Sequence, residues 1–289
     1  MRLLNYRDSD GPSVAGFFDD RWVNLCFADP SLPTNVQNIL GEDQKTKNLI
    51  THLIAIAERA PVLEKQPSNI LPPIPHPEKI LCVGLNYREH AKETGQPIPT
   101  EPLIFSKLGS AVIAHGTDIV LPAVSDQIDF EAELVVVIGK RGRSIPLEQA
   151  WQHVAGYCCG NDISARDWQK GKPGGQWLLG KSFDTFAPLG PWLVLSDAVP
   201  DAGNLAIECR VNGKTMQASN TNNLIFPIDQ LIHYISQVCT LEVGDLLFTG
   251  TPPGVGVARR PPLFLQPGDL VEVEIEKIGT LANSVVASE

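Results

Sequence analysis

Short runs of branched apolar residues, separated by turn signals, dominate the chain from Lys79 onward. Such runs favour strands, because branched side chains fit a pleated and partly buried surface. The runs that predict strands are Ile80–Val83, Val112–Ile113, Ile119–Leu121, Glu133–Ile138, Trp192–Leu195, Ala206–Val211, Leu246–Thr249 and Leu270–Ile275. After Val211, the pair Asn212-Gly213 predicts a two-residue hairpin turn, since both residues tolerate a positive φ.

Helical periodicity is rarer in this part of the chain. The segments that predict helices are Tyr87–Thr94, Leu147–Val154, Ile163–Lys170 and Ile228–Gln237. Many strands with few helices are typical of a mostly-β (α+β) domain built as a barrel, a roll or a sandwich.

The chain before Lys79 predicts a smaller unit. Apolar and polar residues alternate over Val14–Leu25, which predicts a hairpin turning at Asp19-Asp20, and apolar residues recur at helical spacing over Thr46–Arg59. Five prolines fall within residues 66–77, and because proline fixes φ and keeps its predecessor extended, they predict a stiff connector. We therefore expect a small N-terminal α/β domain over residues 1–72 and a larger domain over residues 73–289.

Composition narrows the class of protein. The 289 residues are 43% hydrophobic and 19% charged, as in an ordinary globular protein. A net charge of −10 argues against a nucleic acid or an anionic membrane as partner, because both attract basic proteins. The longest aliphatic run, Leu134–Ile138, is far shorter than the ~20 residues of a membrane span.

The N-terminal segment and the cysteines predict a compartment. Residues 1–8 contain no secretory signal. The six cysteines include no Cys-x-x-Cys pair, which is typical of reduced thiols. Both observations predict a cytoplasmic protein.

Glu131 and Glu133 come just before the apolar run Leu134–Ile138. Residues two apart in a strand project to the same side, and a run that is apolar on both faces predicts a buried strand. Two like charges in such a strand need a cation or a proton to neutralise them. Oxygen ligands with no Cys–His cluster nearby favour Mg²⁺ or Mn²⁺ over zinc. An edge strand with exposed acids is the alternative interpretation.

Asp162 lies where a strand should end and a helix should begin. It is either the N-cap of that helix or a third metal ligand. Arg166 and Gln169 follow it by four and seven residues, so all three can line one helical face. An arginine on that face can clamp a carboxylate with two hydrogen bonds, while a solvated face is the alternative.

Three weaker features complete the set. His90 and Glu93 are spaced i, i+3 on a short helix, so the carboxylate could orient the imidazole to deprotonate a water; a surface pair is the alternative. The glycine-rich turn Gly250–Gly256 can expose N–H groups to an oxyanion. Lys181 follows the Gly/Pro-rich stretch Gly171–Gly175, which could form a lid, and by default is a solvated lysine.

Taken together, these segments resemble the fumarylacetoacetate hydrolase superfamily over Lys79–Val286. The resemblance rests on Gly84–Tyr87 with His90 and Glu93, on Asp129–Glu133, Asn161-Asp162, Arg166 and Lys181–Phe183, and on Gly250–Gly256. Within the superfamily, the branch of fumarylacetoacetate hydrolase domain-containing protein 2 looks most similar. The residues that indicate this branch are Ser164–Gln169, Gln176–Lys181 and Pro252-Pro253-Gly254.

The resemblance implies a β-roll, usually dimeric, that binds one Mg²⁺ or Mn²⁺ through Glu131, Glu133 and Asp162. It implies that the catalytic residues are His90, Glu93 and Lys181, where the first two activate water in the hydrolases. It also implies that the residues around the substrate include Arg166, Gln169 and Thr251. We therefore expect a homodimer and an enolisable 2-oxo or 2,4-dioxo acid as substrate.

Several activities share this chemistry, because a divalent ion that polarises the 2-oxo group stabilises the enolate common to all of them. The branch implies keto–enol tautomerisation of oxaloacetate. The presence of His90 and Glu93 keeps C–C hydrolysis of an acylpyruvate open, and oxaloacetate decarboxylation is a further alternative. A metal-stabilised protein that binds a small acid without turnover is the non-enzymatic alternative.

Overall fold

The computed structural model describes residues 1–42 and 46–288. The helices are α1 Leu25–Ala28, α2 Val36–Glu42, α3 Thr46–Ala57, α4 Arg88–Glu93, α5 Arg166–Gly171, α6 Trp177–Lys181 and α7 Ile228–Val238. The strands are β1 Arg2–Asp8, β2 Gly11–Phe18, β3 Arg21–Asn24, β4 Ile80–Gly84, β5 Leu103–Lys107, β6 Val112–Ile113, β7 Ile119–Leu121, β8 Ile128–Asp129, β9 Ala132–Ile138, β10 Val154–Asn161, β11 Ser164–Ala165, β12 Ala187–Leu195, β13 Ala206–Val211, β14 Lys214–Asn220, β15 Leu246–Phe248, β16 Leu270–Ile275 and β17 Gly279–Ala287. Apart from the predicted helix Leu147–Val154, the strands and helices predicted from the pattern lie on or beside these elements.

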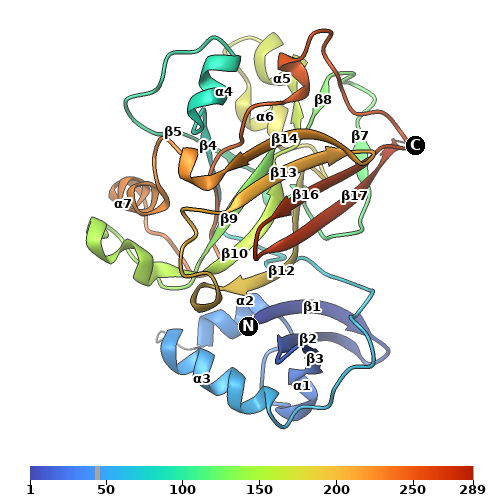
Figure 1. Ribbon diagram of the computed structural model, residues 1–289, viewed down its shortest axis with the longest axis vertical. Helices are drawn as coiled ribbons and strands as arrows, with labels where there is room; N and C mark the ends of the chain where they lie inside the picture. Colours follow the sequence, from blue (N-terminus) through green and yellow to red (C-terminus); the bar gives the residue numbers. More distant parts are fainter. Residues whose placement is uncertain (43–45, 289) are drawn as a thin grey trace.

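One long sheet organises the molecule (Figure 1). Its strand order is β3-β2-β1-β12-β10-β9-β15-β4-β5, and β6 pairs with β12 beside this path. Every residue of β9 and of β10 is buried, so both strands are covered on their two faces. This burial explains the unbroken apolar run Leu134–Ile138 and confirms the prediction of a buried strand there.

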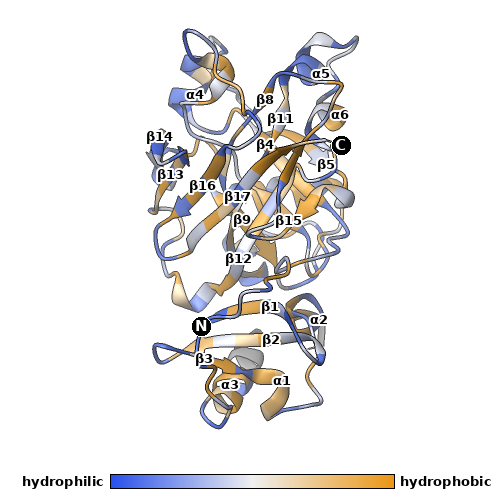
Figure 2. Ribbon diagram, turned by 90° about the vertical axis from the view of Figure 1, so that its right-hand side faces the viewer, coloured by the Kyte–Doolittle hydropathy of each residue, from blue (hydrophilic) through white to orange (hydrophobic). Residues whose placement is uncertain are grey.

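A second sheet, β14-β13-β16-β17-β7, packs against the first. Strands β13, β16 and β17 contact β9, β10 and β12, and the apolar side chains between them form one continuous core. In Figure 2 the apolar strands lie inside the upper part of the molecule, with α4, α5 and α6 at its far end. The architecture is mixed and mostly sheet, which confirms the predicted mostly-β (α+β) class.

The N-terminal residues form a unit at the opposite end of the molecule, in which α1–α3 pack against β1 and β2 of the hairpin strands β1–β3 (Figures 1 and 2). The predicted hairpin is confirmed: β2 and β3 pair around Asp19 and Asp20, both of which adopt positive φ. This unit is joined to the large sheet by antiparallel pairing of β1 with β12, in which Leu3 lies opposite Leu193. The domain boundary at residue 72 stays a prediction.

Two predicted helices differ from the structure. The segment Leu147–His153 forms a 3₁₀ helix, and α5 begins at Arg166 instead of Ile163. The late start has a clear cause, because Ser164 and Ala165 pair with Asp129 and Ile128 as a small two-stranded sheet. Local periodicity does not register such a pairing, since it depends on a segment far away in the sequence.

Candidate metal and substrate site

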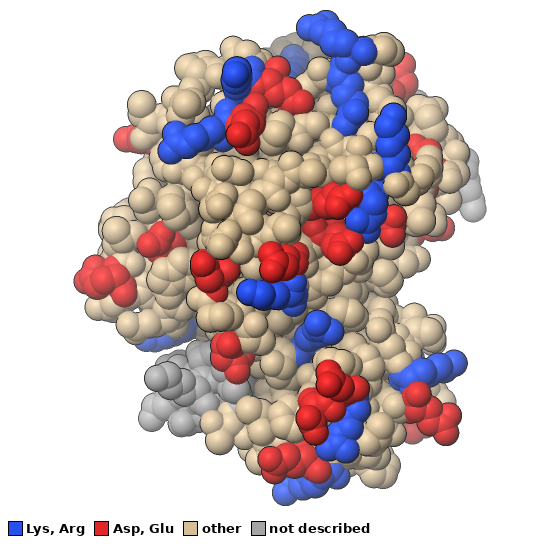
Figure 3. Space-filling model, viewed as in Figure 1, with Lys and Arg blue, Asp and Glu red and all other residues tan. Residues whose placement is uncertain are grey.

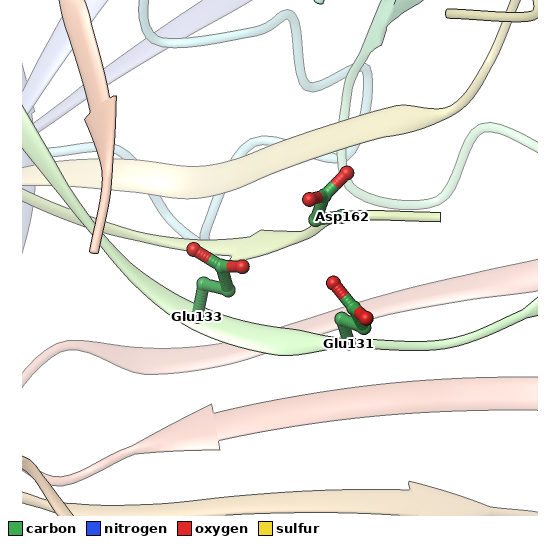
Figure 4. Close-up of side chains that lie close together, drawn as sticks. All are labelled: Glu131, Glu133 and Asp162. Carbon is green, nitrogen blue, oxygen red and sulfur yellow. The ribbon is translucent and has the colours of Figure 1, made fainter. Parts of the chain in front are cut away.

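Strand pairing brings the three predicted metal ligands together. Strand β10 runs antiparallel to β9 with Asn161 opposite Ala132, so Asp162 comes next to Glu131. The Asp162 N–H donates to the Glu131 carbonyl at 2.9 Å, and the Asn161 side chain accepts the Glu131 N–H at 3.0 Å. Glu131, Glu133 and Asp162 each offer an oxygen, and these oxygens lie within 4.8 Å of one another; Figure 4 shows the carboxylates facing a common space.

Two lysines neutralise much of this negative charge. Lys181 Nζ donates to Glu131 Oε2 at 2.6 Å and to Asp162 Oδ2 at 2.7 Å, and so bridges two ligands of the triad. Lys107 Nζ donates to the other Asp162 oxygen at 2.6 Å. Both lysines are buried. The default interpretation of Lys181 as a solvated lysine is therefore wrong, and Lys107 is a site residue that carried no sequence signal.

Arg166 is fixed by groups of the protein itself. Its Nε donates to Asp129 Oδ2 at 2.8 Å, its Nη2 to Glu131 Oε1 at 2.6 Å and its Nη1 to Gln169 Oε1 at 3.0 Å. The Asp129 carboxylate also accepts the N–H groups of Gly256 and Val257. Arg166 thus clamps two protein carboxylates, and Asp129 holds it in place, a role that the sequence did not reveal.

Burial and the neighbouring charges shift the pKa values of Glu131 and Glu133 in opposite directions. Although burial opposes ionisation of Glu131, the nearby Lys181 and Arg166 hold its pKa well below the usual range. For Glu133, burial and the neighbouring charges of Asp162 and Glu131 raise the pKa well above its usual value. The Glu133 carboxylate therefore needs a proton or a further cation to balance it. An all-oxygen, buried set of three carboxylates fits a hard divalent cation such as Mg²⁺ or Mn²⁺.

The predicted dyad lies on α4 beside the triad. His90 Nδ1 pairs with Glu93 Oε2 at 3.2 Å, and His90 is only 6% exposed, so this is not a surface pair. Glu93 also accepts the Gly254 N–H, at 2.9 Å to Oε1 and 3.1 Å to Oε2. One carboxylate thus orients the imidazole and holds the glycine-rich turn.

That turn delivers N–H groups to carboxylates, as predicted of it. The Gly250 N–H donates to Glu133 Oε2 at 2.7 Å, so the oxyanion that it meets is a side chain of the triad. The neighbouring Thr251 hydroxyl donates to the Ala132 carbonyl at 3.0 Å and accepts from Gln217 Nε2 at 2.8 Å. The turn is thereby fixed against the start of β9.

A cavity of about 250 Å³ connects these groups. Its polar lining includes seven of the nine residues predicted for the site, namely His90, Glu131, Glu133, Arg166, Gln169, Lys181 and Thr251. Glu93 and Asp162 lie behind this lining, in contact with His90 and Lys181. The remaining wall is largely apolar and includes Leu103, Phe105 and Trp177. The rings of Phe105 and Trp177 pack edge to face, with their centroids 5.2 Å apart.

Comparison with known proteins identifies the family. Residues 79–286 match the model of the fumarylacetoacetate (FAA) hydrolase C-terminal domain. The chain belongs to this family. Among curated relatives, the protein named oxaloacetate tautomerase FAHD2A, mitochondrial, from Bos taurus is 48% identical over 91% of this chain and 83% of the relative. The Xenopus laevis protein named oxaloacetate tautomerase fahd2, mitochondrial, is 45% identical over 99% of this chain and 90% of the relative.

Solved structures of the fumarylacetoacetate hydrolase family share the whole fold. A putative HpcE protein from Mycobacterium smegmatis has a TM-score of 0.86 and 37% identity, with both chains fully covered. Maleylpyruvate hydrolase from Sphingobium sp. SYK-6, in complex with manganese(II) and pyruvate, has a TM-score of 0.81 and 29% identity, again with both chains fully covered. The predicted similarity to this family is thus confirmed.

These comparisons correct the predicted compartment. The expectation of a cytoplasmic protein is wrong, because the bovine and Xenopus relatives are both named as mitochondrial proteins. Among the helices in residues 1–42 and 46–288, none has the length and apolar character needed to cross a bilayer. On the face in Figure 3, acidic and basic side chains are interspersed and neither forms a continuous patch.

Proposed function

We propose that this member of the fumarylacetoacetate hydrolase family is a Mg²⁺- or Mn²⁺-dependent enzyme that interconverts the enol and keto forms of oxaloacetate. The observation that carries the proposal is the buried triad Glu131, Glu133 and Asp162 at the base of a cavity sized for a small acid. The names of the relatives and the manganese and pyruvate held by the Sphingobium enzyme support the same choice.

The triad would hold the cation, and a cation there would polarise the 2-oxo group of the substrate and lower the barrier to moving the adjacent proton. With Nδ1 of His90 donating to Glu93, Nε2 is the nitrogen left to accept or return that proton. Lys181 and Arg166 fix the orientation of Glu131. Gln169 and Thr251 line the cavity and complete the groups proposed around the substrate.

Proton NMR of freshly dissolved enol-oxaloacetate tests this proposal. With the purified protein and Mg²⁺ or Mn²⁺, we expect conversion to the keto form without pyruvate, and we expect EDTA to abolish the acceleration. Glu133→Gln should behave like the chelated protein, whereas Glu89→Gln, an exposed position on α4, should keep full activity. Pyruvate formed at the same rate would indicate decarboxylation instead, and no acceleration at all would reject the proposal.

Hydrolysis of an acylpyruvate is the second candidate. It is favoured by His90, which lines the cavity with its Glu93 partner behind it, and by an apolar wall suited to a longer substrate tail. Acetylpyruvate is the substrate to try, and His90→Gln should abolish its cleavage while metal binding persists. Binding of either acid without turnover would support the non-enzymatic alternative. The homodimer stays a prediction, which sedimentation velocity would test.

A further inference from the structure

Most of the basic side chains that line the cavity are already paired with acidic side chains of the protein. Arg166 has all three side-chain nitrogens committed to Asp129, Glu131 and Gln169. Lys181 is committed to the triad, and the His90 imidazole to Glu93. Arg166 and Lys181 are therefore already paired with carboxylates of the protein, and Nδ1 of His90 with that of Glu93.

Lys170 is different. It lies in the last turn of α5, four residues after Arg166, and it lines the cavity although its side chain is exposed, which places it at the opening to solvent. Within the described part of the chain, its ammonium group makes no hydrogen bond or ion pair. Partial removal of the Lys170 side chain from solvent and the positive charge of Arg166 lower the pKa of Lys170, and the charges of Glu131 and Asp129 only partly offset this shift.

The neighbouring residue adds a donor. Gln169 is only 2% exposed, and its Oε1 accepts from Arg166, while its Nε2 makes no hydrogen bond to any described residue. A substrate whose 2-oxo acid end lies at the buried triad extends its other end toward the opening. That end then meets an unpaired ammonium.

We propose that Lys170 binds the second carboxylate of the substrate and so makes the site select dicarboxylic over monocarboxylic 2-oxo acids. This inference rests on the proposed function and adds a specificity-determining residue to it. A charge-assisted hydrogen bond of this kind changes affinity by about tenfold to a hundredfold. The lysine acts on the distal group alone, so it should not affect recognition of the 2-oxo acid end.

Steady-state kinetics of three variants test the proposal. Lys170→Met should raise the KM for enol-oxaloacetate at least about tenfold. Lys170→Arg keeps the charge and should stay within about threefold of the wild type. Lys172→Met is the matched control, because Lys172 lies two residues away but packs over the Trp168 ring, 4.7 Å from its centroid, and does not line the cavity.

Pyruvate supplies the second readout, because it has the 2-oxo acid group and lacks the second carboxylate. Its inhibition constant against oxaloacetate should be the same for wild type and Lys170→Met. An active wild type with an unchanged KM in Lys170→Met would overturn the role of Lys170 alone, as would equal losses for oxaloacetate and pyruvate. A wild type that accelerates nothing would instead reject the proposed function, and the inference with it.

Discussion

At the scale of single residues, the site is a balance of buried charges. The carboxylates are those of Asp129, Glu131, Glu133 and Asp162, and the cations are Lys107, Arg166 and Lys181. Burying such groups is costly, and removing one partner leaves an uncompensated charge in the interior. The balance therefore makes each member important for stability as well as for chemistry.

Lys107 gives the sharpest test of this balance. Lys107→Met leaves Asp162 Oδ1 without its partner, so we expect the free energy of unfolding to fall by about 3 kcal/mol. Urea unfolding in the presence of EDTA measures the loss. Lys214→Met, at an exposed position on β14, is the control and should change stability little. Equal unfolding midpoints for the two variants would contradict the account.

His115 predicts how stability depends on pH. Its Nδ1 accepts the Ala282 N–H at 3.0 Å, and burial lowers its pKa below the usual 6.5. The folded protein thus binds fewer protons there than the unfolded chain, so this residue makes stability fall as the pH drops below 6.5. In His115→Asn, whose side chain keeps an acceptor, the loss of stability between pH 7.5 and pH 5.5 should be smaller. Urea midpoints at both pH values measure it, and an unchanged difference would refute the role of His115.

Single residues also show which parts of the site could be predicted from the sequence. Glu131 and Glu133 were found because acids beside a run that is apolar on both faces violate the burial pattern, and this signal is local. Lys107 and Asp129 were missed because each acquires its role only through a partner that is distant in the sequence, Asp162 and Arg166 respectively. Sequence periodicity reports which residues are buried and cannot report which buried charges meet.

At the scale of elements, the strands were predicted better than the segments that join them. Strand β9 and the hairpin turn at Asn212-Gly213 follow from local pattern, and the positive φ of both turn residues confirms the turn. The start of α5 was misplaced because β11 pairs with β8. The site is assembled from the ends of β9 and β10, the three short helices α4, α5 and α6, and a glycine turn, so its geometry depends on their mutual packing.

The glycine turn is therefore a good place to perturb the site. Gly254 has a φ of +107°, and a Cβ there would meet the Met216 carbonyl, so Gly254→Ala must shift the turn that Glu93 holds. We expect kcat to fall by about tenfold or more, because the dyad loses its orientation. Gly268→Ala is the control: its φ is +94°, but a Cβ there would meet no atom of the described residues within 4 Å. An unchanged kcat in Gly254→Ala would contradict the role of the turn, and an equal fall in Gly268→Ala would attribute the loss to backbone strain in general instead of the Glu93 contact.

At the scale of the whole molecule, the N-terminal unit and the main sheet are continuous. Strand β1 pairs with β12, and Trp22 contacts Trp192 with ring centroids 5.5 Å apart. Because backbone pairing and aromatic packing both cross the junction, the two parts should unfold together. The N-terminal unit thus supports the strand that lies beside β10, and β10 leads to Asp162.

Trp22→Ala tests this coupling. The side chain is 8% exposed, and its removal should cost about 3–5 kcal/mol. Calorimetry should show one transition at a lower temperature for the whole chain. Arg21→Ala, at an exposed neighbouring position, should leave the transition nearly unchanged. Two separate transitions in the tryptophan variant, with the upper one unshifted, would show that the parts unfold independently.

The ammonium group of Lys181, held between Glu131 and Asp162, has a consequence for how the protein matures. In small zinc-dependent domains the ion is required for the chain to fold at all. Here the acidic residues are already kept in place by lysines and an arginine, so folding can finish before any ion arrives. Under the proposed function, the ion would then enter from the surrounding solution after folding, and the same finished polypeptide would accept manganese or magnesium according to supply.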